Sequence, residues 1–170
     1  SLAETMGFSL PGGASIPAPD ANHTRLASAS GRRIVQMVWE DIRPSSFLSR
    51  GSFENSIAAA MAMGCSTNAI IHVIAIGRRA GFNVSLDDFD RIGRKVPVIA
   101  NIRPNGDTYL MEDFYYAGGL LGMLNRINGY LQTKCMNVNG KSIGQNIKNA
   151  EVYNDDIIRT LDNPICPTGA

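Results

Sequence analysis

The chain has 170 residues, of which 44% are hydrophobic and 18% charged, and its formal net charge is +1. This length and composition describe one folded domain with a sizeable core, and they exclude a disordered chain. The near-zero charge, with basic residues no more than paired, gives no electrostatic reason to expect nucleic acid or an anionic membrane as a partner.

The N-terminal quarter of the sequence predicts helices separated by a long loop. Residues 1–7 are typical of the last turns of a helix that a glycine closes, and we expect that helix to begin upstream. Residues 8–19 hold three prolines and two glycines, so they cannot form a regular element. A helix should then run from near Asp20 until Pro44 ends it, with apolar side chains on one side: Ile34, Val35, Val38 and Ile42.

A polar elbow at residues 64–68 organises the next stretch. Ser49 is predicted to cap a helix that continues through the apolar residues 58–63 into the elbow. Residues 69–76 follow, and because their isoleucines and valine cover every side of a helix, we expect this second helix to be buried all round. The elbow is either a helix cap or the floor of a site, and the residue types favour a cap formed by Ser66, Thr67 and Asn68.

Beyond the elbow, short helices should surround a few strands. Ser85 and Asp88 fit a capping box at the start of an amphipathic helix. Residues 96–102 are short, β-branched and bounded by Pro-Asn-Gly, which makes them the best strand candidate. Helices are expected at 109–116, from Leu120 and at 142–149, with a short strand and turn at 136–140. We therefore predict an α/β fold that is helix-rich, with a small, mostly parallel sheet flanked by helices.

Few side chains have the spacing of a metal site or a nucleophile. Three widely spaced cysteines argue against a disulfide framework and favour a reducing cytoplasm. Cys65 has no second Cys or His at a ligand spacing, so we interpret it as a packing residue. The acids at 87, 88 and 90 are better explained as first-turn helix caps than as metal ligands. The glycines at 118–122 resemble a phosphate-binding loop only loosely, and close helix packing explains them more simply.

For two further sets of residues, a role in a functional site remains an alternative to a purely structural role. His72 lies four residues after Asn68, so both share a helix face; such a histidine is usually a core residue, and a role in a site is the alternative. Glu112 and Asp113 lie in an apolar, aromatic segment, where one carboxylate could point inward for acid–base work or cap the following glycine turn.

Five stretches of the sequence, in collinear order, match a known family. They read SLPGGASIPA at 9–18, GRRIVQMV at 31–38, FENSIAAAMAMGCSTNAIIHVIAI at 53–76, SLDDFDRIGRKVPVIANIRPNG at 85–106 and YLMEDFYYAGG at 109–119. The chain resembles the dihydroxy-acid and sugar-acid dehydratases, which include phosphogluconate dehydratase, and the last stretch is closer to the sugar-acid branch.

The resemblance implies a hydro-lyase that converts a sugar acid into a 2-keto-3-deoxy acid with an iron–sulfur cluster and Mg²⁺. The family's cluster cysteines, magnesium-binding acids, modified lysine and catalytic serine fall outside the matched stretches. The resemblance therefore places no catalytic residue and no metal ligand in this chain. Cys65 stands where the family usually has a glycine, so it is not recruited as a ligand. The substrate-pocket candidates are Ser66, Thr67, Asn68 and His72.

The resemblance also implies a domain organisation. Residues 1–150 would be the later part of the family's N-terminal domain, and residues 151–170 a linker toward a C-terminal domain. The parent enzyme is expected to be a cytoplasmic homo-oligomer, a dimer or tetramer, and the isolated 170 residues are expected to lack turnover.

Three alternatives stay open from the sequence. One is a dihydroxy-acid dehydratase of branched-chain amino-acid synthesis. Another is a non-catalytic binding or assembly domain that has lost the active-site segments. The third is a nucleotide-binding α/β domain, which rests on the glycines at 118–122 alone.

Overall fold

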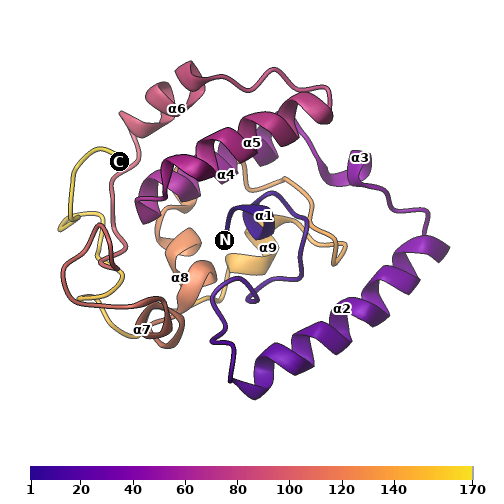
Figure 1. The fold of residues 1–170 in the computed structure, drawn as a ribbon, viewed down its shortest axis with the longest axis horizontal. Coiled ribbons are helices and arrows are strands. Elements are labelled where there is room, and N and C mark those ends of the chain that lie inside the picture. The colour runs from indigo at the N-terminus through magenta and orange to yellow at the C-terminus, as the bar shows by residue number, and fades with distance from the viewer. Residues whose placement is uncertain (170) are drawn as a thin grey trace.

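The structure is a computed structural model that describes residues 1–169, and its helices pack around one central helix, α4 (Arg50–Met63) (Figure 1). Phe53, Ile57 and every residue from Ala58 to Met63 are buried. The alanines and serines of α4 let neighbouring segments approach its backbone closely, so this helix forms the core. The predicted cap is confirmed, since the Ser49 hydroxyl accepts the N–H of Ser52 at 3.2 Å.

The other helices, in chain order, are α1 (Leu2–Thr5), α2 (Ala21–Trp39), α3 (Pro44–Phe47), α5 (Thr67–Arg79), α6 (Leu86–Gly93), α7 (Met111–Tyr116), α8 (Gly119–Arg126), the 3₁₀ turn η1 (Asn128–Tyr130) and α9 (Ile143–Ile147). Of these, α1, α5 and α6 pack against α4, and the others lie farther from it (Figure 1). Within residues 1–169, no helix is both long enough and apolar enough to cross a membrane.

The helix after the elbow differs from its prediction. We expected α5 to be buried all round, but only Val73 and Gly77 are buried, and Ile71 is 66% exposed. That prediction was wrong because α5 packs with one face on α4 and presents the other face outward. The helix before the elbow occupies the centre instead, because its small side chains allow closer packing than the isoleucines do.

The expected sheet is absent from the described residues, so the predicted α/β class with a small, mostly parallel sheet is wrong. Residues 96–102 are extended, but they form only isolated bridges, such as Val98 with Cys166 and Ala100 with Ile158, both antiparallel. The N–H groups of Ile99 and Ala100 donate to the carbonyl of Ala62 at the end of α4. This extended run therefore satisfies its backbone with a helix end and a loop, and no second strand is needed.

In the segment 151–169, residues 157–166 lie along this extended run. Ile157 and Ile158 are buried in the core, and the N–H of Arg159 donates to the carbonyl of Ile99 at 2.7 Å. The segment thus packs on the domain over the part that the structure describes. Its predicted role as a linker toward a further domain stays a prediction.

The helix α2 lies at the periphery of the molecule (Figure 1). It begins beside Asp20 as predicted, and Asp20 caps it by accepting the N–H of Asn22 at 2.7 Å. It ends at Trp39, and Pro44 begins α3 instead of ending α2. Only Met37 of this helix is buried. Of the predicted apolar side, Ile34, Val35 and Val38 are exposed, and Ile42, which follows the helix, is partly buried against Met37 and its neighbours.

Candidate functional site

The elbow is a well-formed helix end followed by a helix cap. Gly64 has φ 65°, and the N–H of Cys65 donates to the carbonyl of Ala60 at 3.0 Å. These features are those of a Schellman motif, which satisfies the last carbonyls of α4. The Ser66 hydroxyl then accepts the N–H of Asn68 at 3.2 Å and caps α5. The predicted cap at the elbow is confirmed.

A loop at residues 103–108 lies against the elbow. The side-chain amide of Asn105 donates to the carbonyl of Gly64 at 2.6 Å. The loop is tight, because the N–H of Gly106 donates to the carbonyl of Ile102 at 2.7 Å and the Arg103 guanidinium donates to the carbonyl of Asp107 at 3.0 Å. Gly106 is required there, since a Cβ would lie 2.3 Å from Oδ1 of Asn101.

A polar hollow of about 390 Å³ lies between this loop and the C-terminal segment. Its lining residues are Asn101, Asp107, Thr108, Arg159, Asn163, Pro164 and Ile165. They meet here because the bridge between Ala100 and Ile158 brings the C-terminal segment beside the extended run. We define these seven residues as the polar hollow.

Arg159 is the basic residue of the polar hollow. Its side chain is 30% exposed, and its Nη1 lies 3.8 Å from the Asp156 carboxylate, which is a weak ion pair. Its Nε is buried and has no hydrogen-bond partner among the described residues. A buried guanidinium N–H without a partner is costly. The part of the guanidinium that is exposed lines the hollow, and its N–H groups suit an anion that enters there.

The four predicted pocket residues lie outside the polar hollow. Ser66, Thr67, Asn68 and His72 are all exposed, on the elbow and the first turns of α5. Ser66 has a structural role as a cap, and the others lie on the surface of the described chain. The prediction that they line a substrate pocket is not tested and stays a prediction. The Asn105 bond nevertheless connects the elbow to the loop that forms one wall of the hollow.

Sequence reasoning missed the polar residues of the hollow. The only signal for them was the Pro-Asn-Gly turn after residues 96–102, which we used only as a strand boundary. Arg159 and Asn163 carried no signal at all, because the C-terminal segment reads as turn composition and its pairing partner is about 60 positions away in sequence. For Glu112 and Asp113 the sequence left acid–base work and a cap of the following glycine turn open. The Asp113 carboxylate instead accepts the N–H of Leu110 at 2.7 Å, at the start of α7.

A buried carboxylate anchors the loop at residues 8–19. Glu4 is 4% exposed, and its two oxygens accept the N–H groups of Gly12, Gly13 and Ala14 at 2.6, 3.0 and 2.7 Å. Burial raises the pKa of Glu4 above its ordinary value, although the N–H groups of Gly12 and Ala14 oppose that rise. Glu4 therefore shapes the loop and is not free for acid–base chemistry.

The glycines at 118–122 pack against a neighbouring backbone. A Cβ at Gly118 would lie 2.3 Å from the carbonyl oxygen of Glu151, and one at Gly122 would lie 2.7 Å from the same oxygen. The N–H of Tyr153 also donates to the carbonyl of Ala117 at 2.9 Å. Close packing thus accounts for these glycines, as the simpler prediction had it.

The described residues do not form a ligand set for a metal or an iron–sulfur cluster. Within residues 1–169, no three side chains of His, Cys, Asp or Glu come together as a metal site would require. Cys65 is partly buried, and burial raises the pKa of its thiol, which disfavours the thiolate that binds metal. These residues do not fit the cluster or the magnesium ion that the resemblance implies.

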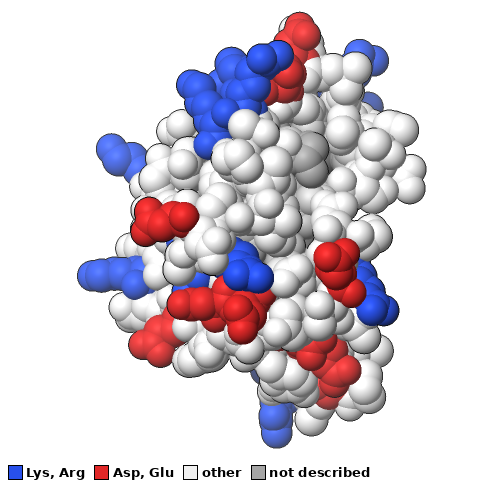
Figure 2. Space-filling model, turned by 90° about the vertical axis from the view of Figure 1, so that its left-hand side faces the viewer, with Lys and Arg blue, Asp and Glu red and all other residues white. Residues whose placement is uncertain are grey.

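Charge is spread thinly over the surface. Figure 2 shows acidic and basic side chains in small groups, several of them of mixed sign, with uncharged surface between the groups. No field of one sign dominates the face in view. A hollow with one guanidinium, amides, a hydroxyl and a carboxylate can bind a small polyol that carries one anionic group.

Comparison with known proteins gives a consistent set of relatives. A family model described as "Dihydroxy-acid/6-phosphogluconate dehydratase N-terminal" matches residues 1–146. The chain is 48% identical over 165 residues to the 6-deoxy-6-sulfo-D-gluconate dehydratase of Pseudomonas putida, which covers 97% of this chain and 28% of that protein. It is 43% identical over 169 residues to the L-arabinonate dehydratase of Rhizobium leguminosarum bv. trifolii, with 98% and 29% covered.

A third relative is named for a dihydroxy acid and not for a sugar acid. The chain is 41% identical over 170 residues to the dihydroxy-acid dehydratase of Caldicellulosiruptor bescii, which covers 99% of this chain and 31% of that protein. The chain therefore spans about three tenths of the length of the relatives that it matches.

Proposed function

The chain belongs to the dihydroxy-acid/6-phosphogluconate dehydratase family, and from that premise we propose that it is part of a longer hydro-lyase that dehydrates a sugar acid to a 2-keto-3-deoxy acid. The observation that carries the proposal is the order of the identities. Relatives named for sugar acids are 48%, 43% and 44% identical, whereas those named dihydroxy-acid dehydratases are 41%, 39% and 40% identical.

The reaction itself constrains what a binding site has to do. The proton α to the carboxylate and the β-hydroxyl leave together as water, and the resulting enol tautomerises to the 2-keto acid. A carboxylate α-proton is weakly acidic, so positive charge near the carboxylate assists its removal. In this proposal the Arg159 guanidinium binds the carboxylate of the sugar acid.

The other groups of the polar hollow would bind hydroxyls. Thr108 and Asn163 offer a hydroxyl and an amide, and Asp107 offers a carboxylate that accepts from sugar hydroxyl groups. Pro164 and Ile165 supply an apolar wall for the carbon chain. Asn105 lies in the same loop as Asp107 and Thr108 and bonds the carbonyl of Gly64 in the elbow. The elbow therefore holds the loop that forms this wall of the site.

The iron–sulfur cluster and Mg²⁺ belong to the proposal for the longer enzyme. The cluster and the magnesium ion would supply Lewis-acid assistance to the departing hydroxyl. Their ligands would come from outside residues 1–169, because the described residues hold no suitable set of metal-binding side chains. The location in the cytoplasm, the homo-oligomeric state and a small sugar acid as the only partner are likewise parts of this proposal.

One second function has specific support. The relatives named dihydroxy-acid dehydratases cover 99% of this chain, so the same segment serves in enzymes with that name. A branched-chain dihydroxy acid has a carboxylate but fewer hydroxyls, so it would use fewer of the polar groups in the hollow. The sugar acid is the better match to a site with this many polar side chains.

A substrate panel on the full-length enzyme tests the proposal. The cluster-loaded protein is assayed for 2-keto acid formation with aldonic acids of five and six carbons, a sulfo-substituted gluconate and a branched-chain dihydroxy acid. We expect at least one sugar acid to give a kcat/KM more than about tenfold above that of the dihydroxy acid, a difference of about 1.4 kcal/mol. The reverse order would establish the second function, and no turnover of any acid by the loaded enzyme would contradict both.

A further inference from the structure

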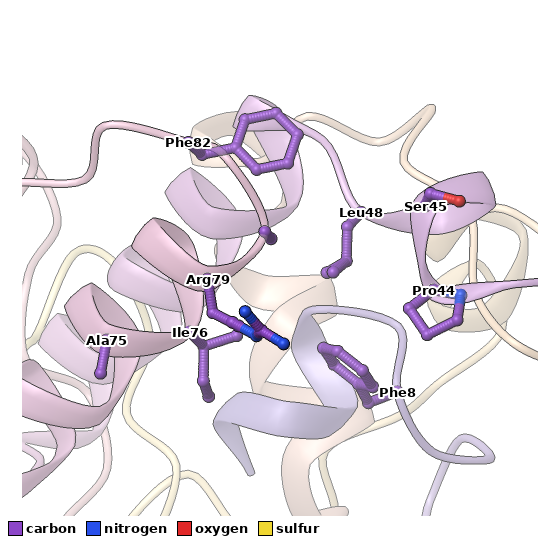
Figure 3. Close-up of a pocket in the computed structure, with 9 residues that line it drawn as sticks. Phe8, Pro44, Ser45, Leu48, Ala75, Ile76, Arg79 and Phe82 are labelled. Carbon is purple, nitrogen blue, oxygen red and sulfur yellow. The ribbon is translucent and has the colours of Figure 1, made fainter.

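A second cavity of the described residues lies away from the polar hollow and is almost wholly apolar. It measures about 580 Å³ and lies between α5, α3 and the start of the loop at 8–19 (Figure 3). Its walls are Phe8, Pro44, Leu48, Ala75, Ile76 and Phe82, with Ser45, Ala80 and Arg79 at the edges. We call it the α5 cavity.

Within residues 1–169, Arg79 is the only charged residue that lines the α5 cavity. Its guanidinium extends from the end of α5 toward Phe8 (Figure 3). Among the described residues, no hydrogen bond or ion pair engages it. Arg78 and Arg79 both lie in the last turn of α5, where cations complement the helix dipole, but Arg78 does not line the cavity. The part of the cavity that the structure describes therefore combines an apolar interior with one free cation at its rim.

The apolar surface continues beyond the cavity along α5. Ile71, Ala75 and Arg79 are spaced by four residues, so they form one row on the helix over about 12 Å. Ile71 is 66% exposed. An enclosed site for a small ligand would end at the cavity walls, whereas a row of this length fits a segment of polypeptide.

The relatives indicate where such a segment would come from. The chain covers only 28–31% of their length, so most of a protein of that size lies outside these 170 residues. A cavity with an apolar lining that continues along its helix onto the exposed side chain of Ile71 is typical of an interface. Its charge complement is an anion, because Arg79 is the one charge that the described lining presents.

We propose that the α5 cavity is the docking site for a segment of the same polypeptide outside these 170 residues, which inserts a large apolar side chain and pairs an adjacent Asp or Glu with Arg79. The inference rests on the chain being part of a longer enzyme, and it does not depend on which acid that enzyme dehydrates. The docked segment would couple α5, and hence the elbow at its start, to the remainder of the enzyme.

Photo-crosslinking of the full-length enzyme tests the proposal. Benzoylphenylalanine replaces Ser45, which is exposed and lines the cavity, and in a control protein it replaces Lys148, which is exposed and does not. We expect Ser45 to give a cross-link at monomer mass, with the captured peptide outside these 170 residues and containing an Asp or Glu. A band at dimer mass would assign the cavity to a second copy, and a yield no higher than that at Lys148 would mean that no segment fills it. Either result overturns the proposal.

The charge is tested separately by matched variants. Arg79→Met should lower the thermal midpoint of the full-length enzyme by about 1–2 °C, whereas Arg78→Met should leave it unchanged. Equal effects of the two variants would contradict the predicted ion pair. Both readouts are independent of turnover, so their failure would leave the dehydratase proposal standing.

Discussion

The side-chain amide of Asn105 donates a hydrogen bond to the backbone carbonyl of Gly64 at 2.6 Å. This bond joins the end of the central helix α4 to the loop that forms one wall of the polar hollow. Gly64 is also in the left-handed region, with φ 65°, and a Cβ at this position would lie 1.5 Å from Nδ2 of Asn105. Position 64 therefore requires glycine for its backbone conformation and for the loop that contacts it.

The first prediction separates these two requirements. Gly81 has φ 84°, and a Cβ added there would have no neighbouring atom within 4 Å, so Gly81→Ala carries the conformational cost alone, about 1–2 kcal/mol. Gly64→Ala should cost a further 0.5–1.5 kcal/mol or so, because it displaces the Asn105 amide. Urea denaturation measures both free energies of unfolding. In an Asn105→Ala background the extra cost should vanish, and an unchanged extra cost would show that the bond contributes nothing.

The second prediction concerns Glu4. Burial raises its pKa above 4.5 in the folded state, so its contribution to stability is fully present below pH 4.5 and is lost as the pH rises through the folded pKa. Glu4→Gln leaves at least one N–H of the loop without an acceptor and should cost about 1–3 kcal/mol at pH 4. The stability difference between the two proteins should shrink from pH 4 to pH 7. A difference that grows with pH would mean that the three N–H groups outweigh burial.

The third prediction concerns Asp88, for which the stability changes with pH in the opposite direction to Glu4. Asp88 is buried, which raises its pKa, but the N–H of Ser85 and the guanidiniums of Arg91 and Arg50 together lower it below 3.8. Its contribution is present above pH 3.8 and is lost as the pH falls through the folded pKa. Because both arginines lie partly in solvent, Asp88→Asn should cost only about 1 kcal/mol at pH 7.

The same measurement series checks Asp88. The stability difference between wild type and Asp88→Asn should narrow as the pH falls from 5 to 3, and it should also narrow in 1 M salt, which screens the ion pairs. A difference that is independent of pH would show that Asp88 acts only as a helix cap, a role that asparagine also fills.

The fourth prediction tests the packing of α8 on the C-terminal segment. A Cβ at Gly122 would lie 2.7 Å from the carbonyl oxygen of Glu151, which is backbone and cannot move without its chain. Gly122→Ala should therefore destabilise the protein by about 1–3 kcal/mol, despite alanine's better helix propensity. Gly129→Ala is the control, because its Cβ would meet open space. If both variants were equally stable, residues 151–152 would not pack on α8.

The sequence predicted most of the local elements, because their signals are local. The caps predicted at Ser49, Ser66 and Ser85 depend on residues two or three positions away, and all three are present. Gly7 has φ 98° and closes α1 as expected. The loop at 8–19 was recognised by its prolines and glycines, although its anchor Glu4 was not.

Long-range relationships could not be predicted in the same way. Residues 96–102 have strand composition, but their partners are the carbonyl of Ala62 and residues 157–166, and no periodicity in the sequence specifies that choice. The burial of α5 was overestimated because a continuous apolar run reads the same at a core and at an interface. Ile71 and the outward apolar side of α2 belong to such runs and are exposed in the described chain. Arg159 could not be predicted as a site residue, because its surroundings depend on pairing between segments that are far apart in the sequence.

The central claim is that Arg159 in the polar hollow binds the carboxylate of a sugar acid. In the full-length enzyme, Arg159→Met should lower kcat/KM for the best sugar acid by about 10–150-fold, the loss of one charge-assisted contact, and Arg159→Lys should recover part of it. Arg94→Met is the control, because Arg94 pairs with Asp90 at the surface.

The most direct measurement compares the sugar acid with its neutral amide as competitive inhibitors of the full-length enzyme. The wild-type enzyme should bind the acid at least about tenfold more tightly than the amide, and Arg159→Met should bind the two about equally, since only the acid carries the charge that Arg159 recognises. A preference for the acid that is the same in wild type and in Arg159→Met would contradict the assignment of the polar hollow as the substrate site.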